Sequence, residues 1–202
     1  MIIIGLVGGV ACGKSHVAGD FQTLGACVLS ADRIGHQVLQ IDRVKQALGQ
    51  RWGDAVVDAE GELCRSALAK IVFRGDPKAM GELAFLESVT HPEITRILEA
   101  RMAELDKLGC FPFVVLDAAV MMKTGWDKLC DRLIFVEVPR VLRVKRGRLR
   151  GLDEAQFSAR EAAQTPLAEK KARADLMIDN SGTPQQTFQQ VQKVWRSLVE
   201  IA

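Results

Sequence analysis

A glycine-rich run near the N-terminus, residues 8–15 (GGVACGKS), constrains the fold of this chain more than any other feature. Before it, residues 2–7 form a short apolar run rich in isoleucine, which is typical of a strand buried on both faces. After it, apolar side chains recur at helical spacing as far as Leu24, and Gly25 stands where a helix commonly ends. This order matches the G-x-x-x-x-G-K-[ST] pattern of loops that hold phosphate groups. The run therefore predicts a nucleotide-binding domain of the α/β class.

The backbone of this loop is expected to hold the phosphates. Its glycines allow successive N–H groups to turn toward a β-phosphate, and the N-terminus of the following helix adds positive potential. The residues expected to contact the nucleotide are Gly8, Gly9, Ala11, Cys12, Gly13, Lys14, Ser15 and His16. The alternative is an ordinary glycine turn before a helix.

Strands and helices alternate along the rest of the chain. Further strands are predicted at residues 26–29, 113–116, 133–138 and 176–178. Helices are predicted at residues 33–48, where Gly49 is expected to end the helix, from His91-Pro92 onward, and at residues 185–201. Residues 51–110 are expected to be helical, with turns at 58–61 and 76–77. The order predicts a single domain (1–202) with a three-layer α/β/α core, a mainly parallel sheet and a helical region at 33–112.

Two side chains of the loop and one later carboxylate are candidates for phosphate and metal chemistry. Lys14 is expected to reach the β- and γ-phosphates, and the Ser15 hydroxyl to bind Mg²⁺. Asp117 ends the run FVVLD, a form typical of strands whose final Asp holds Mg²⁺. The alternatives are a solvated Lys14 and an Asp117 that only caps a turn.

Asp32 lies just after the second predicted strand, at the edge of the sheet where open α/β folds bind ligands. A carboxylate there can accept a proton from an acceptor hydroxyl, or orient that hydroxyl toward a γ-phosphate. Asp32 can equally be the N-cap of the following helix, and the two roles are compatible.

Six of the chain's 27 Lys and Arg residues lie between residues 139 and 152, without an acid among them. They are Arg140, Arg143, Lys145, Arg146, Arg148 and Arg150. We interpret residues 139–165 as a lid that closes over the triphosphate, with Arg146 and Arg150 stabilising the transferring phosphoryl group. The alternatives are a solvated helix face and a nucleic-acid patch. Nucleic acid is the weaker alternative because the stretch has no aromatic side chains for base stacking.

Composition excludes several other classes of protein. The net charge of +2 argues against a surface built to hold nucleic acid, and no apolar run is long enough to span a bilayer. The five cysteines form no CxxC pair and, with three histidines, give no zinc spacing. We therefore expect a cytoplasmic protein with reduced thiols that binds neither membranes nor nucleic acid.

Several segments together resemble the dephospho-coenzyme A kinases. The loop is similar to that family's Gly-Gly-x-x-x-Gly-Lys-Ser, residues 30–32 to its Asp-Ala-Asp, and residues 91–92 to its His-Pro. The tail follows the family's order and spacing through Arg160, Ala162-Ala163-Gln164, Lys170, Ala174-Asp175 and residues 178–182. Ser30, Ala119 and Lys123 depart from the family's Asp, Pro and Glu.

The resemblance implies ATP- and Mg²⁺-dependent phosphorylation of the ribose 3′-hydroxyl of dephospho-coenzyme A. It further implies that Asp32 meets this hydroxyl, that the region 33–112 binds the substrate, and that Asn180 lies near the adenine of ATP. We expect the protein to be a monomer or weak homo-oligomer. Two other hypotheses remain: a kinase of similar fold for a nucleoside monophosphate or another small metabolite, and an ATP-switched nucleic-acid-binding module.

Overall fold

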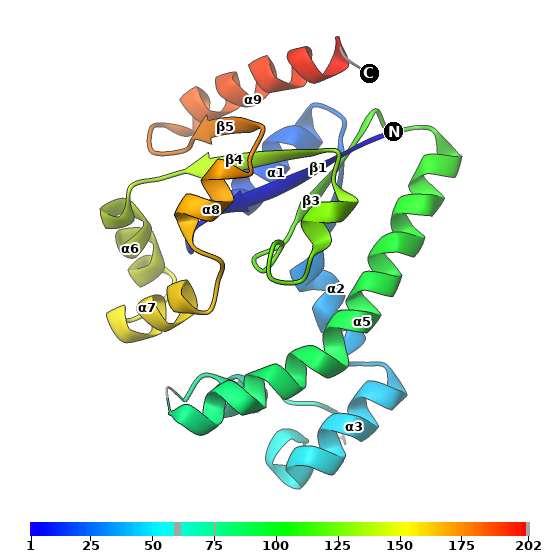
Figure 1. Ribbon diagram of the computed structural model, residues 1–202, viewed down its shortest axis with the longest axis vertical. Helices are drawn as coiled ribbons and strands as arrows, with labels where there is room; N and C mark the ends of the chain where they lie inside the picture. The colour runs from blue at the N-terminus through cyan, green and yellow to red at the C-terminus, as the bar shows by residue number, and fades with distance from the viewer. Residues whose placement is uncertain (59–61, 75, 201–202) are drawn as a thin grey trace. The chain divides into compact units, whose positions relative to one another are not determined.

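The computed structural model describes residues 1–58, 62–74 and 76–200, and Figure 1 shows the course of the chain. By their contacts the residues form two compact units: Met1–Ala31 with Ala100–Ala202, and Asp32–Glu99. Residues 59–61, most of one predicted turn, and residue 201, the end of the predicted last helix, lie outside the described residues.

The first unit is built on a sheet of five parallel strands in the order β2-β3-β1-β4-β5. The strands are β1 (Ile2–Gly8), β2 (Cys27–Ser30), β3 (Phe113–Asp117), β4 (Arg132–Glu137) and β5 (Leu176–Asp179). The predicted α/β fold is confirmed, and all five strands lie within a residue of their predicted ends. Because the strands are parallel, their carboxyl ends share one edge. Asp117 at this edge pairs in register with Leu6 of β1 and with Ser30 of β2.

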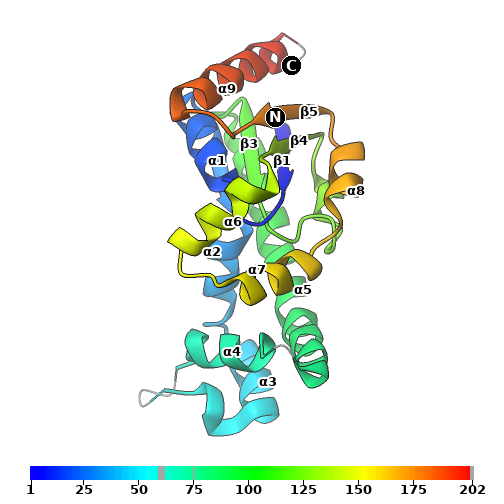
Figure 2. The same cartoon turned by 90° about the vertical axis from the view of Figure 1, so that its left-hand side faces the viewer.

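Helices cover both faces of this sheet. The helices that pack on the strands are α1 (Lys14–Thr23), α8 (Leu167–Ala172) and α9 (Pro184–Val199). The unit also contains the end of α5 (Pro77–Leu108), η2 (Trp126–Leu129), α6 (Arg140–Leu149) and α7 (Glu154–Ala162). Figure 2 shows α1 and α8 on opposite sides of the sheet. Phe21 of α1 and Val191 of α9 are fully buried against the strands, and Trp195 packs edge-on to Phe113 at 4.7 Å between ring centroids. This core anchors the strand ends that carry the loop.

The second unit is helical. Its elements are α2 (Ala31–Val38), α3 (Asp42–Trp52), η1 (Gly53–Val56), α4 (Arg65–Val72) and the first part of α5. Glu82 of α5 accepts hydrogen bonds from the Trp52 Nε1–H (2.7 Å) and the Arg51 guanidinium (3.0 Å), so a polar cluster joins α5 to α3. The Trp52 indole also meets the Phe85 ring edge-on at 5.5 Å between centroids.

Two predicted helix boundaries in this unit are wrong. The predicted helix 33–48 is two helices, because Ile41 adopts an extended backbone before α3, and α3 then runs through Gly49 to Trp52. The apolar spacing continues across the break since both helices bury one face, and a helix interior tolerates Gly at a cost of about 1 kcal/mol. Pro92 lies inside α5 instead of starting a helix. Proline removes one backbone N–H and kinks a helix without necessarily ending it, and Figure 1 shows α5 bent part-way along its length.

Candidate active site

The glycine-rich loop runs from the end of β1 to the start of α1 in a conformation that includes left-handed backbone. Gly13 has φ 89°, and Ala11, with φ 57°, is the one non-glycine residue in the described part of the chain with a positive φ. Such a conformation costs of order 1 kcal/mol or more for a residue with a Cβ, and it is concentrated at ligand sites. The Cys12 N–H donates to the Gly9 carbonyl oxygen at 3.2 Å, which closes the turn.

Neighbouring side chains approach the loop backbone so closely that its glycine positions have no room for a Cβ. A Cβ at Gly8 would lie 2.6 Å from the Cys12 sulfur, and a Cβ at Gly9 would lie 2.6 Å from Nη1 of Arg143. A Cβ at Gly13 would overlap the Asn180 amide. The glycine pattern thus reflects tight packing behind the loop as well as backbone freedom.

Three buried side chains hold the loop by its carbonyl oxygens. The donors are Lys170 Nζ to Gly8 (3.0 Å), Arg143 Nη1 to Val10 (3.5 Å) and Asn180 Nδ2 to Cys12 (2.8 Å). Each of these side chains belongs to a residue no more than 4% exposed. In a trans peptide the C=O and the next N–H point in opposite directions. Holding alternate carbonyls from behind therefore turns the N–H groups that follow them away from the protein interior, as phosphate binding requires.

Sequence reasoning missed this role for Arg143 and Lys170. The three contacts join residues 162, 133 and 168 positions apart in the chain, so local spacing carries no signal of them. Asn180 was expected near adenine. Its side chain instead donates to the loop and accepts from the Thr187 hydroxyl (2.9 Å), so its contact with adenine stays a prediction.

Two lysines contribute to the positive charge around the loop. Lys14 is half-buried at the start of α1, and Lys170 is buried behind the loop. Burial, and then the positive charge of Lys14, lowers the pKa of Lys170 to about 8. The Gln164 side chain accepts a second hydrogen bond from Lys170 at 2.8 Å. Positive charge is therefore concentrated around the loop, where a triphosphate would neutralise it.

The structure brings together the two predicted metal ligands. The Ser15 hydroxyl donates to Asp117 Oδ2 at 2.6 Å, from the first turn of α1 to the end of β3. A hydroxyl and a carboxylate at this distance are oxygen ligands of the kind Mg²⁺ prefers, and the ion takes few protein ligands when phosphates and water supply the others. The residues present therefore fit this metal.

The predicted lid arginines differ in position. Arg146 donates to the Asn180 backbone oxygen at 2.8 Å, and its Nη1 lies 3.9 Å from a Cβ built on Gly13, so it lies beside the loop. Arg150 is exposed at the end of α6. His16 is also exposed; its N–H donates to the Gly13 carbonyl oxygen at 3.0 Å, within the first turn of α1.

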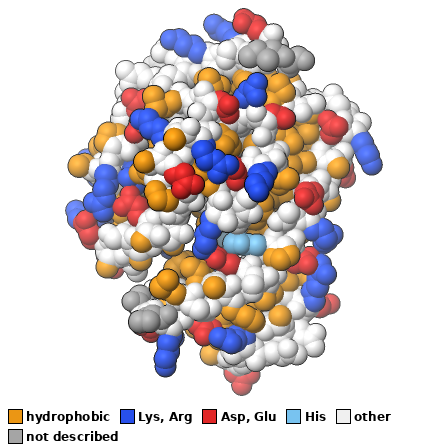
Figure 3. Space-filling model, in the orientation of Figure 1, with side chains coloured by type: hydrophobic (Ala, Val, Ile, Leu, Met, Phe, Trp, Pro, Cys, Tyr) orange, Lys and Arg blue, Asp and Glu red, His pale blue; other side chains and the backbone are white. Residues whose placement is uncertain are grey.

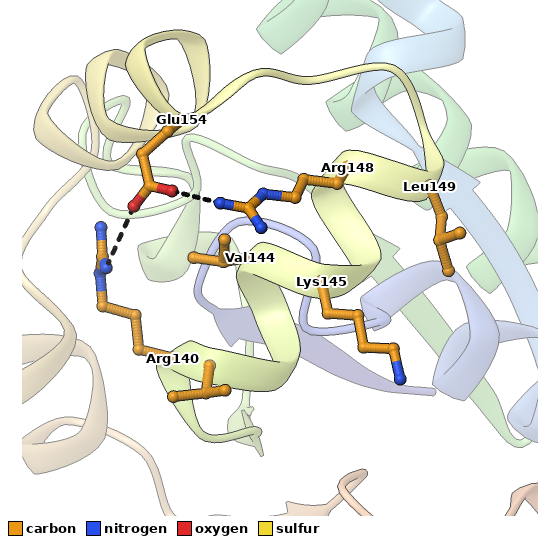
Figure 4. A pocket seen from close by; sticks show the side chains of 7 residues that line it. Arg140, Val144, Lys145, Arg148, Leu149 and Glu154 are labelled. Atoms are coloured by element: carbon orange, nitrogen blue, oxygen red, sulfur yellow. Dashed lines mark hydrogen bonds and ion pairs between the residues drawn. The ribbon is translucent and has the colours of Figure 1, made fainter.

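Two arginines on the pocket-lining side of α6 form ion pairs with α7. Figure 4 shows Arg140 and Arg148 converging on Glu154 of α7, at 4.0 and 2.7 Å, across a pocket of about 640 Å³. On the face of the molecule in Figure 3, Lys and Arg side chains are likewise interspersed with Asp and Glu. The concentration of positive charge in the sequence is therefore partly neutralised by α7.

Asp32 lies in the first turn of α2, so its alternative role as the N-cap of that helix is wrong. It is the first residue of the second unit, two residues beyond the end of β2. Its place in the reaction stays a prediction. Among the described residues, no helix is long and apolar enough to cross a membrane.

Comparison with known proteins decides the family. The model of the dephospho-CoA kinase family matches residues 2–186. This chain belongs to that family. A dephospho-CoA kinase of Syntrophotalea carbinolica is 39% identical over 201 residues, which cover 98% of this chain and 93% of that protein. Membership of the family that the sequence resembles is confirmed, and the chain therefore belongs to a family of kinases.

Solved structures agree with this assignment. A crystal structure from Thermus thermophilus matches with a TM-score of 0.80 at 32% identity and covers 97% of this chain and 96% of that one. The dephospho-CoA kinase of Campylobacter jejuni matches with a TM-score of 0.69 at 26% identity, over 97% of this chain and 96% of that one.

Proposed function

We propose that this chain transfers the γ-phosphoryl group of ATP to the ribose 3′-hydroxyl of dephospho-CoA, giving CoA and ADP. The match to the family over nearly the whole chain supports dephospho-CoA as the substrate. The observation that carries the phosphoryl transfer is the loop, with alternate carbonyls bound from behind and Lys14 at its end. A cytoplasmic location and a monomeric or weakly associating state stay predictions.

The loop and its lysine account for most of the proposed transition-state stabilisation. N–H groups directed away from the interior bind the β-phosphate, and Lys14 neutralises charge on the β- and γ-phosphates as the bond to the leaving oxygen breaks. Arg146 would neutralise charge on the transferring group, and its position beside Gly13 supports this role. Asp32 orients the acceptor hydroxyl in line with the γ-phosphate or takes its proton.

Ser15 and Asp117 would hold Mg²⁺, which supplies charge neutralisation across the β- and γ-phosphate oxygens when bound. Replacing Asp117 by Asn keeps one ligand oxygen but removes the charge. We expect Asp117→Asn to raise the Mg²⁺ concentration that gives half-maximal rate by roughly 10- to 100-fold. Titration of the rate with Mg²⁺ at saturating ATP measures this. Asp106→Asn, at an exposed carboxylate of α5, is the control, and equal Mg²⁺ curves for both variants would contradict the assignment.

Lys170 makes ATP binding pH-dependent. Since its pKa lies at about 8, its charge is lost above this pH, and we expect kcat/KM for ATP to fall as the pH rises through about 8. The groups that surround it are Lys14, Cys12, Arg143 and Gln164. Between about pH 8 and the ordinary lysine range the unfolded chain binds more protons than the folded one, so Lys170 makes folding stability rise with pH. If ATP affinity falls in this pH range, the fall is therefore not caused by Lys170 destabilising the fold.

Two variants test this pH dependence. Lys170→Met removes the charge at every pH, so its kcat/KM for ATP should be low and should lack the inflection near pH 8. Lys171→Met, an exposed neighbour paired with Glu137, should keep the wild-type profile. An inflection that survives in Lys170→Met would assign it to another group.

The reaction itself is tested by incubating the protein with ATP and Mg²⁺, with and without dephospho-CoA. We expect ADP release that depends on dephospho-CoA, and a product that carries its new phosphate on the ribose 3′-oxygen. A panel of nucleoside monophosphates and other small alcohols tests the alternative acceptor class. Turnover with one of these and none with dephospho-CoA would overturn the proposed substrate.

A further inference from the structure

Of the three side chains that hold the loop carbonyls, only Arg143 comes from α6, the first helix of the predicted lid. Its guanidinium makes contacts in several directions. Nε donates to the Val138 carbonyl oxygen at 3.2 Å, and Nη1 donates to Glu161 Oε1 at 2.6 Å and to the Val10 carbonyl oxygen at 3.5 Å. One side chain thus joins the end of β4, the helix α7 and the phosphate loop.

The burial of Arg143 makes this connection stiff. Its side chain is 3% exposed, and a buried guanidinium needs a partner charge because isolated ions are costly away from water. Glu161 of α7 supplies that charge. Although burial raises the pKa of Glu161, hydrogen bonds from Arg143 and Arg140 outweigh burial and hold the pKa below its ordinary value. The carboxylate is therefore ionised near neutral pH, and the pair stays charged.

The close contact between the Arg143 guanidinium and the phosphate loop leaves little room for either to move. Arg143 Nη1 would lie 2.6 Å from a Cβ at Gly9, and all three guanidinium atoms nearest to that position lie within 3.0 Å of it. The Phe157 ring of α7 lies 5.9 Å from the guanidinium carbon, and a Cβ at Gly147 would meet the same ring at 2.8 Å. A shift of α7 against α6 would therefore disturb the guanidinium group that packs beside Gly9 and donates to Val10.

We propose that Arg143, held in place by Glu161, is a positioning residue that couples the α6–α7 pair to the phosphate loop and so sets the affinity for ATP. The coupling is reciprocal: a triphosphate that fixes the loop N–H groups also fixes Arg143, and with it the packing of α7 against α6. Arg148 pairs with Glu154 of α7 and, among the described residues, makes no contact with the loop, so it holds the two helices together without this effect.

This proposal rests on the proposed function only in its choice of ATP as ligand, so binding is measured apart from turnover. The probe is a non-hydrolysable ATP analogue with Mg²⁺, titrated calorimetrically without an acceptor. We expect Arg143→Gln to raise the dissociation constant roughly tenfold. Glu161→Gln should also raise the dissociation constant. The double variant should bind the analogue as well as Arg143→Gln does, because both changes break the same contact between Arg143 and Glu161.

Two further variants separate positioning from stability. Arg148→Gln removes an equivalent charge from the exposed side of α6 and should leave the dissociation constant within about twofold of wild type. Arg143→Lys keeps the charge but loses the branched geometry that joins Val138, Glu161 and Val10, so it should bind several-fold more weakly than wild type. This variant also serves if Arg143→Gln does not fold.

Wild-type affinity for the analogue in Arg143→Gln or in Arg143→Lys, with only a lower melting temperature, would overturn the proposal and leave a structural ion pair. Wild-type protein that binds the analogue but does not phosphorylate dephospho-CoA would overturn the proposed acceptor and leave this inference standing. The KM for dephospho-CoA should be unchanged in both Arg143 variants, because their effect is confined to the ATP site.

Discussion

Replacing Lys14 by Ala is expected to lower kcat roughly 10³-fold, because the variant loses a positive charge that stabilises the leaving and transferring phosphates in the transition state. Lys14 begins α1 directly after the left-handed Gly13, so it follows the loop without an intervening residue. Lys170 does not replace it, since its amine is committed to the Gly8 carbonyl and Gln164. Single-turnover measurement of phosphoryl transfer at saturating ATP gives the loss directly.

The interaction between Lys14 and Lys170 gives the Lys14→Ala variant a second measurable effect. The positive charge of Lys14 contributes to the lowered pKa of Lys170, so in Lys14→Ala that pKa should rise and the inflection in ATP binding should move above pH 8. Lys107→Ala, at an exposed position in the last turn of α5, is the matched control and should keep both the rate and the pH profile. A Lys14→Ala variant that retains most of the wild-type rate of phosphoryl transfer would contradict the proposed mechanism.

Asp32→Asn is the second change with a large expected effect, a fall in kcat of roughly 10²- to 10⁴-fold with little change in the KM for ATP. Asparagine keeps the shape of the side chain and its ability to accept a hydrogen bond, but it has no charge and cannot take a proton. The effect should therefore fall on the chemical step. The rate is measured by ADP release at saturating concentrations of both substrates.

Asp42→Asn is the control for this change, because Asp42 also lies in the first turn of a helix of the second unit and is exposed. It should turn over at the wild-type rate. Comparison of Asp32→Asn with Asp32→Ala separates the two roles: similar losses indicate a base, whereas a much smaller loss for Asn indicates a group that only orients the hydroxyl. An Asp32→Asn rate equal to that of Asp42→Asn would remove Asp32 from the reaction.

Much of the nucleotide-binding core followed from local patterns. The apolar runs predicted all five strands because a strand buried on both faces needs continuous apolar residues, whatever its neighbours are. The pairing of Ser15 with Asp117 was also predictable, since parallel strands bring their carboxyl ends to one edge. Helix boundaries were less predictable: Gly49 and Pro92 are tolerated inside helices because tertiary packing outweighs the propensity of one residue.

The sequence by itself determined the phosphate loop, the parallel sheet and the family, because these depend on residue types at short, regular spacing. Only the tertiary structure decided how the loop is held. Arg143 and Lys170 look like ordinary surface cations in the sequence, yet both are buried and donate to loop carbonyls more than 130 residues away. Burial of a charge depends on which partners the fold brings to it, here Glu161 and the loop carbonyls, and no local spacing encodes those partners.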